Sequence, residues 1–152
     1  DVKKAANKKH SDIALGILEV PEISQKALGK YWKKHSAEQQ DQFQKLLRDL
    51  FVHVAFPSSA KFFASLDLMY GKSKSKKGMT VVPITVIHEK EGEVDIDFKM
   101  KQFAKNWLVV DVILDGVSMR NNLRSQFYKI LKKNDFNELI RRMKKKLKEA
   151  QG

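Results

Sequence analysis

Apolar residues recur along this chain at two different spacings, and the change between them divides the sequence into three parts. From residue 11 to about residue 65 they recur every three or four positions, which is typical of amphipathic helices. Over residues 66–114 they alternate with polar residues, which is typical of strands. The helical spacing returns over residues 118–147. This order of helices, an antiparallel meander and helices again predicts the α+β class.

The clearest helix is predicted to begin at residue 36. Ser36 and Gln39 have the spacing of a capping box, in which each side chain satisfies a free backbone donor of the other residue. A complete apolar stripe follows on one side of the helix: Phe43, Leu46, Leu47, Leu50, Phe51 and Val54. Pro57 interrupts this helix, and residues 60–65 are expected to add one short helical turn.

Two shorter helices are predicted before it. The first covers residues 13–18 and is expected to end near Pro21, because proline disfavours a helical residue before it. The second covers residues 23–32 and contains Gly29 in its interior. Residues 1–10 carry four lysines and little apolar material, so we expect them to be frayed.

Two further helices are predicted near the end of the chain. Ser118 is the expected cap of the first, and Asp135 with Glu138 repeats the capping-box spacing at the start of the second. One side of the last helix is apolar. Its other side is basic: Arg141, Arg142, Lys144, Lys145, Lys146 and Lys148.

Four strands are predicted, at about residues 66–70, 79–87, 94–101 and 107–114. In the third, apolar residues alternate with Asp and Lys, which indicates a sheet with one face in water. Antiparallel pairing is therefore expected.

The connections between these strands fit that pairing. Glu91 and Gly92 suit a hairpin turn, and the lysine-rich loop of residues 71–78 is polar enough to stay in solvent. Pro83 lies within the second strand, where its missing backbone donor indicates a sheet edge or a bulge.

Composition narrows the choice of function. A length of 152 residues is typical of one domain, so residues 1–152 are taken as one unit, and the absence of Cys excludes thiol catalysis. The net charge of +12 predicts attraction to polyanions. Lys supplies 25 of the 30 cations and Arg only 5, which disfavours nucleic acid as the partner, because Arg is the better reader of bases and phosphates.

Candidate catalytic residues are few. The four histidines are scattered, so a metal site has little support, and no phosphate-binding loop or nucleophile elbow is present. Asp111 and Asp115 are expected on the same side of the fourth strand as Trp107, where a desolvated carboxylate could act as a base. A carboxylate in this position more often bonds to the backbone of a covering helix.

Nine phenylalanines give the chain a large apolar content. For each of them an ordinary packed core is the expected role, since well-packed interiors are the norm. The alternative is that some of them line a cavity between the long helix and the sheet, which periodicity cannot distinguish from a filled interior.

Two sequence blocks carry a resemblance to a known family. Residues 27–43 read ALGKYWKKHSAEQQDQF, and residues 107–127 read WLVVDVILDGVSMRNNLRSQF. They resemble the corresponding segments of MlaC proteins, also called toluene-tolerance auxiliary transport proteins. The order of elements is similar over about residues 11–147.

The resemblance implies a fold and a function. The fold is a set of helices packed on a curved four-stranded antiparallel sheet that encloses an apolar lipid pocket. The function is that of a periplasmic lipid carrier, with no catalysis, no metal and no cofactor. Such a carrier moves phospholipid between the inner and outer membranes and so maintains outer-membrane lipid asymmetry.

The resemblance also implies partners. They are an inner-membrane ABC transporter complex with its substrate-binding membrane subunit, and an outer-membrane lipoprotein. A monomer is expected, and any signal peptide is expected to have been removed from this sequence. The basic segments 72–77 and 141–148 are expected to assist transient contact with an anionic membrane or with an acidic transporter face.

The residues expected to line the pocket come from the long helix, the segment after it, the sheet and the region beyond the sheet. They are Leu47, Leu50, Phe51, Val54, Phe62, Phe63, Val82, Ile84, Val94, Ile96, Phe98, Val117 and Phe127.

Three other functions stay open on the sequence alone. One is a carrier of hopanoid or another polycyclic lipid. The second is a lysine-rich domain that binds polyanions, and the third is a small isomerase that uses Asp111 as its base.

Overall fold

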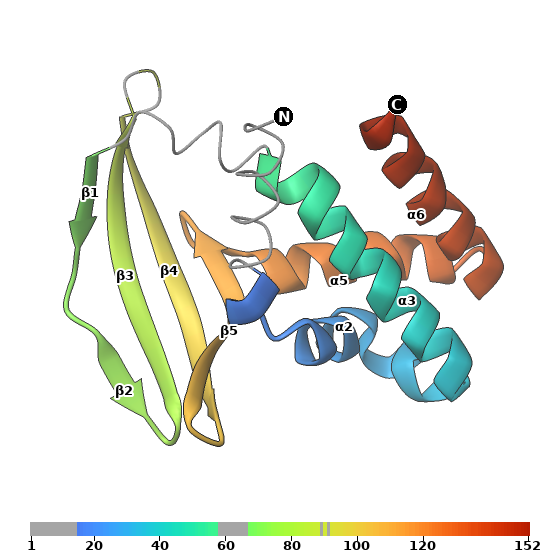
Figure 1. Ribbon diagram of the computed structural model, residues 1–152, viewed down its shortest axis with the longest axis horizontal. Helices are drawn as coiled ribbons and strands as arrows, with labels where there is room; N and C mark the ends of the chain where they lie inside the picture. The colour runs from blue at the N-terminus through green and yellow to red at the C-terminus, as the bar shows by residue number, and fades with distance from the viewer. Residues whose placement is uncertain (1–14, 58–66, 89, 91) are drawn as a thin grey trace.

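The computed structural model describes residues 15–57, 67–88, 90 and 92–152, and gives the backbone alone at residues 67–70 and 88. The sheet stands at one side of the molecule and the helices at the other, and β5 is the strand nearest to the helices (Figure 1). The predicted α+β class and its order of elements are confirmed. The helical elements are α2 (Val20–Leu28), the 3-10 helix η1 (Gly29–Lys34), α3 (Ala37–Leu50), the π-helix η2 (Phe51–Ala55), α5 (Met119–Leu131) and α6 (Phe136–Gln151).

The first predicted helix ends before Pro21 as expected, with residues 15–17 helical, whereas the second begins earlier than predicted and ends at Gly29. Pro21 lies in the first turn of α2, where its missing N–H costs nothing, because that donor has no partner within the helix. Gly29 ends α2 with a φ of 52°, a left-handed conformation that favours glycine. A Cβ at this position would overlap the Tyr128 hydroxyl, which accepts a hydrogen bond from the Lys30 backbone N–H at 3.0 Å.

The long helix starts as the sequence predicts and stays helical to Pro57, but it contains a π-helical turn that the sequence did not predict. The Ser36 hydroxyl accepts from the Gln39 backbone, and the Gln39 side chain accepts from the Ser36 backbone at 2.9 Å, which completes the capping box. The α-helical hydrogen-bond pattern ends at Leu50, and the next residues, through Ala55, form one turn of π-helix. Phe51 and Phe56 stack across this turn with ring centroids 6.3 Å apart.

The sheet has six strands in the described part of the chain, two more than predicted. They are β1 (Asp67–Tyr70), β2 (Lys74–Lys76), β3 (Met79–His88), β4 (Gly92–Phe103), β5 (Asn106–Leu114) and β6 (Val117–Ser118). All pairs are antiparallel in the order β1-β3-β4-β5-β6, with β2 also on β3. The predicted meander is confirmed, and the two additional strands are only three and two residues long.

The interpretation of Pro83 as an edge residue fits the pairing on the outer side of β3. β1 ends opposite Ile84 and β2 begins opposite Val81, so Pro83 lies at the break between the two short strands. Its carbonyl accepts from the Gly71 N–H at 2.8 Å, and its missing N–H falls on this outer side of β3, where the ladder is interrupted. The segment 71–78, predicted as a loop, is exposed as expected but contains β2.

A bulge in β5 overturns the prediction that Asp111 and Trp107 share a face. Trp107 pairs with Gln102 of β4, whereas Asp111 pairs with Lys99, and the register shifts between Lys99 and Met100. Gln102 and Lys99 are three positions apart in a strand, so they point to opposite faces. Because paired residues share a face, the extra residue in β5 places Asp111 opposite to Trp107.

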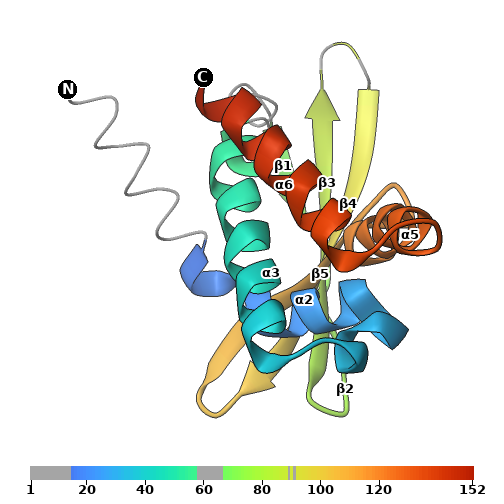
Figure 2. The same ribbon diagram turned by 90° about the vertical axis from the view of Figure 1, so that its right-hand side faces the viewer.

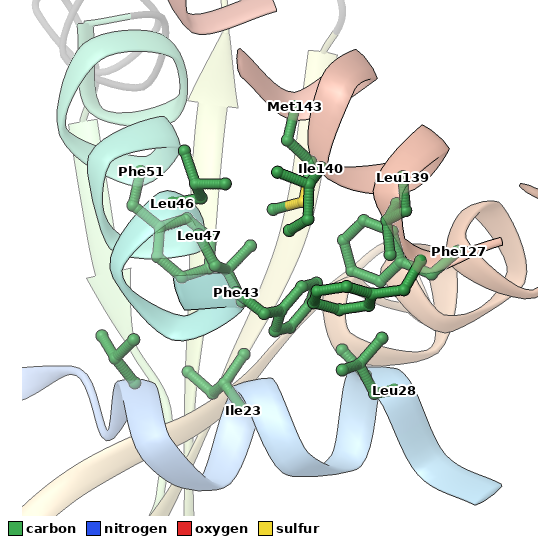
Figure 3. Close-up of a cluster of buried hydrophobic side chains, with 13 residues drawn as sticks. Ile23, Leu28, Phe43, Leu46, Leu47, Phe51, Phe127, Leu139, Ile140 and Met143 are labelled. Carbon is green, nitrogen blue, oxygen red and sulfur yellow. The ribbon is translucent and has the colours of Figure 1, made fainter. Parts of the chain in front are cut away.

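The helices form a core of their own. α6 packs along α3, and α2 contacts both α3 and α5 (Figure 2). Their side chains point toward one another, with the Phe43 and Phe127 rings edge to face at a centroid distance of 5.3 Å (Figure 3). The helical core consists of Val20, Ile23, Ala27, Leu28, Phe43, Leu46, Leu47, Phe51, Phe127, Phe136, Leu139, Ile140 and Met143.

The caps of α5 and α6 differ in completeness. Ser118 caps α5 by accepting from the Asn121 N–H, and Asp135 caps α6 by accepting from the Glu138 N–H. The reciprocal bond predicted for Glu138 is absent, because its carboxylate is bound by Arg141 at 2.7 and 2.8 Å and by Arg142 at 2.9 Å. These guanidinium bonds compete with the return bond to the cap and satisfy both carboxylate oxygens.

This double ion pair gives a pH prediction. Hydrogen bonds from Arg141, then from Arg142, lower the pKa of Glu138 from its usual 4.5 to about 2. A carboxyl whose pKa is lower in the folded state stabilises the fold above pH 4.5, and that contribution is lost as the pH falls toward 2. Carboxyl ¹³C chemical shifts of Glu138 during acid titration should show the lowered midpoint. High salt should raise it, since the group faces solvent; a midpoint near 4.5 at low salt would disprove the pairing.

Candidate functional site

A second apolar cluster lies on the sheet. Val86, Val94 and Ile96 are buried at its centre, with Val86 at 0% and Ile96 at 2% exposure, and we call these three together with Ile84, Phe98 and Val112 the sheet cluster. The register aligns Val86 with Val94, Ile84 with Ile96 and Phe98 with Val112. Since paired residues share a face, all six lie on one face of β3, β4 and β5.

The opposite face of the same strands is polar. Asp95 and Asp97 of β4 point there, and the Thr85 hydroxyl donates to the Asp95 carboxylate at 3.1 Å. The alternation predicted for this strand is thus confirmed, and it makes only one face suited to apolar contacts.

The sheet cluster and the helical core are separate in the described part of the chain, because no residue of either belongs to the other. An apolar face that does not merge with the main core is suited to line a binding site for an apolar molecule. The exposed part of this face continues to Leu114, which pairs with Ile96 on one side and with Val117 on the other.

The structure divides the predicted lining residues between these places. Leu47, Phe51 and Phe127 belong to the helical core, and Leu50 packs against it. Val94 and Ile96 lie within the sheet cluster, with Ile84 and Phe98 packed around them.

The remaining predicted residues lie outside both clusters or outside the described residues. Val82 is half-buried and shares the face of Phe98, its partner in β4. Val54 is half-buried in η2, and Val117 is 59% exposed in β6. Phe62 and Phe63 fall outside the described residues.

Two residues of the sheet cluster were missed from the sequence. Val86 continues the alternation of Val82 and Ile84 and is the most buried residue of β3, so the period of two could have identified it. Val112 was harder to find, because the bulge reverses the alternation of β5 after residue 110.

Asp111, the residue considered as a base, is engaged in structural bonds. It is 3% exposed, and its carboxylate accepts from the Val112 N–H at 2.8 Å, the Arg120 N–H at 3.0 Å and the Ser118 hydroxyl. These bonds fasten the start of α5 to β5. The sequence favoured a carboxylate that bonds to the backbone of a covering helix over a catalytic base, and Asp111 makes bonds of this kind.

The described residues contain neither a group that could bind a metal nor a helix that could span a membrane. Among residues 15–57, 67–88, 90 and 92–152, no group of three His, Cys, Asp or Glu side chains could hold a metal ion. The helices in these ranges also lack any stretch long and apolar enough to cross a membrane.

Comparison with known proteins identifies the family. The family model described as MlaC protein matches residues 2–145, which is nearly the whole chain. The chain belongs to the MlaC family. The resemblance of the two sequence blocks is thereby confirmed, and a search of curated proteins found no match to this MlaC-family member.

A solved structure matches the fold of this MlaC protein. It is a phospholipid-binding protein from Ralstonia solanacearum in complex with a phospholipid, with a TM-score of 0.78 and 18% sequence identity. The match covers 91% of this chain and 78% of the other. At this identity the likeness establishes the fold, and it shows that helices and an open antiparallel sheet in this arrangement occur in a protein that holds a phospholipid.

Proposed function

We propose that this MlaC protein is a periplasmic carrier that binds the acyl chains of a phospholipid against the sheet cluster. The observation that carries the proposal is a buried apolar sheet face that is separate from the helical core. Membership of the MlaC family and the likeness of the fold to a phospholipid complex support it.

The energetics explain why a carrier would need such a face. Burial of one methylene group is worth about 0.8 kcal/mol, so two acyl chains with about thirty of them represent roughly 20 kcal/mol. Unaided transfer through water is therefore very slow. A carrier must replace the contacts of the bilayer almost evenly, because a much tighter site would not release the lipid and a much weaker one would not load it.

The proposal includes the wider system. The lipid moves between the outer and inner membranes together with an ABC transporter complex, its substrate-binding membrane subunit and an outer-membrane lipoprotein. The protein acts as a monomer, without a cofactor, without catalysis and without nucleic acid. The head group stays in solvent, since burying a charged group against the apolar sheet cluster would be costly.

Native mass spectrometry of the purified protein tests this function. We expect a bound species with the mass of a two-chain phospholipid, retained under gentle ionisation and removed by detergent. A bound mass that matches a hopanoid or another polycyclic lipid would instead support the alternative carrier. Protein without any bound lipid in repeated preparations, and unable to take up phospholipid from vesicles, would contradict both.

A further inference from the structure

The helix α6 presents a basic face to solvent. Six basic residues of this helix are exposed, and we call them the α6 basic face: Arg141, Arg142, Lys144, Lys145, Lys146 and Lys148. The connection from α5 adds two more exposed cations, Lys132 and Lys133. The result is a dense group of positive charges on one side of the helical layer.

The arginines and the lysines of this face differ in their partners. Arg141 and Arg142 both bind Glu138 of the same helix. The four lysines have no carboxylate within ion-pair distance among the described residues. The positive charge that is free for another molecule is therefore supplied by lysine.

Free lysines favour one class of partner. A lysine ammonium is a compact, strongly hydrated point charge, whereas the arginine fork recognises single carboxylates and phosphates in a fixed geometry. Four unpaired lysines within about one and a half helical turns are suited to a diffuse negative surface such as that of anionic phospholipids. A specific acidic protein site would more commonly use arginine, and here both arginines are occupied.

The other side of α6 limits how this contact can be made. Phe136, Leu139, Ile140 and Met143 are buried in the helical core, so α6 has no free apolar side to insert into a bilayer. The large exposed hydrophobic residues of the described chain all lie elsewhere, on other elements. Contact through this face would be electrostatic, sensitive to salt and readily reversed.

We propose that the α6 basic face docks this protein reversibly on membranes rich in anionic phospholipid. The inference rests on the proposed function, because a carrier must approach a membrane system to load or release its cargo. The docking itself needs no bound lipid. The docking and the carrier function can therefore be disproved independently of each other.

Two matched variants test the docking. The first carries Lys→Gln at positions 144, 145, 146 and 148, which removes four charges and keeps good helix formers. The control carries Lys→Gln at positions 72, 74, 76 and 77 and so has the same net charge. These four exposed lysines belong to the second basic segment for which the sequence predicts membrane contact, whereas the proposal assigns the contact to α6 alone. Cosedimentation at low salt uses vesicles of phosphatidylcholine with phosphatidylglycerol, and vesicles of phosphatidylcholine alone.

The α6 variant should lose binding to the anionic vesicles by at least about tenfold, because each lysine near such a surface contributes substantially. The control should lose less than about threefold, and the wild-type protein should not bind neutral vesicles. Equal losses in the two variants, binding to neutral vesicles, or no binding to either would overturn the proposal. Capture by immobilised poly-glutamate but not by anionic vesicles would overturn it in favour of an acidic protein partner.

Bound lipid is measured by mass spectrometry on the same preparations. Lipid retained in the α6 variant together with lost vesicle binding supports both the docking and the carrier function. If the wild-type protein holds no lipid but its vesicle binding still depends on α6, the carrier function fails and the docking stands.

Discussion

Ile96→Glu should abolish phospholipid binding while the protein stays folded. Ile96 is buried in the sheet cluster, where a carboxylate would be placed against hydrocarbon if acyl chains occupy this face. An unpaired charge in such surroundings costs several kcal/mol, which is enough to lower lipid occupancy by more than about tenfold. Once the lipid has left, water can hydrate the carboxylate. Native mass spectrometry and thermal melting of the same sample measure the two effects.

The helical core supplies the matched control. Leu139 has 0% exposure at the contact of α6 with its neighbouring helices, so Leu139→Glu would bury its charge in a packed interior without a partner. That cost takes most of the 5 to about 15 kcal/mol that stabilises an ordinary domain, and we expect the variant to unfold. If Ile96→Glu also unfolds, or keeps its phospholipid, the sheet cluster is ordinary core and the proposed site is wrong.

Asp111→Ala should destabilise the protein strongly. The substitution leaves the Val112 and Arg120 N–H groups without their acceptor and frees the Ser118 hydroxyl. Each donor left without its acceptor costs about 1 to 3 kcal/mol, so for the three donors we expect a total loss of about 3 to 9 kcal/mol. For a chain of this size that lowers the melting temperature by roughly 10 °C or more.

Asp97→Ala is the control for this prediction. Asp97 lies on the neighbouring strand β4 and pairs with Pro83, and the described structure shows no side-chain bond from it. Its removal should change the free energy of unfolding by less than about 0.5 kcal/mol. Urea denaturation of both variants provides the comparison. Similar stability of the two would mean that the bonds of Asp111 do not hold α5 to β5.

Much of the fold follows from local patterns in the sequence. The caps at Ser36, Ser118 and Asp135 are bonds between residues three positions apart, so their spacing is visible along the chain. The alternation in β4 similarly shows which of its faces is apolar. Such features depend on a few neighbouring residues, and the structure agrees with them.

The structure differs from the sequence prediction where the local conformation depends on residues that are distant in the chain. Gly29 is left-handed, and its place next to Tyr128 depends on a residue far along the chain. The bulge in β5 depends on how two strands pair, and it moves Asp111 to the face opposite Trp107. The order of apolar residues in the sequence contains no sign of the left-handed Gly29 or of the bulge, so it could predict neither of them.

The candidate site shows the same limit. Periodicity identified the apolar side of α3 and of the strands, but it could not show that Leu47 and Phe51 contact other helices while Ile96 belongs to a different cluster. A filled core and a lined cavity would bury the same residues. Only the packing of the elements separates a lining residue from a core residue.

The way in which β5 joins the two halves of the molecule has a mechanical consequence. α2 and α5 pack against β5, and β5 bonds directly to the chain that precedes α2, where the Glu19 N–H donates to the Val109 carbonyl at 2.9 Å. Between the helices and β3 or β4, the described residues show one ion pair, Lys101 of β4 with Glu22 of α2 at 3.3 Å, and fewer contacts than β5 makes. β5 therefore carries most of the connection between the sheet and the helices, and a load placed on β3 or β4 reaches the helical core mainly through this one strand.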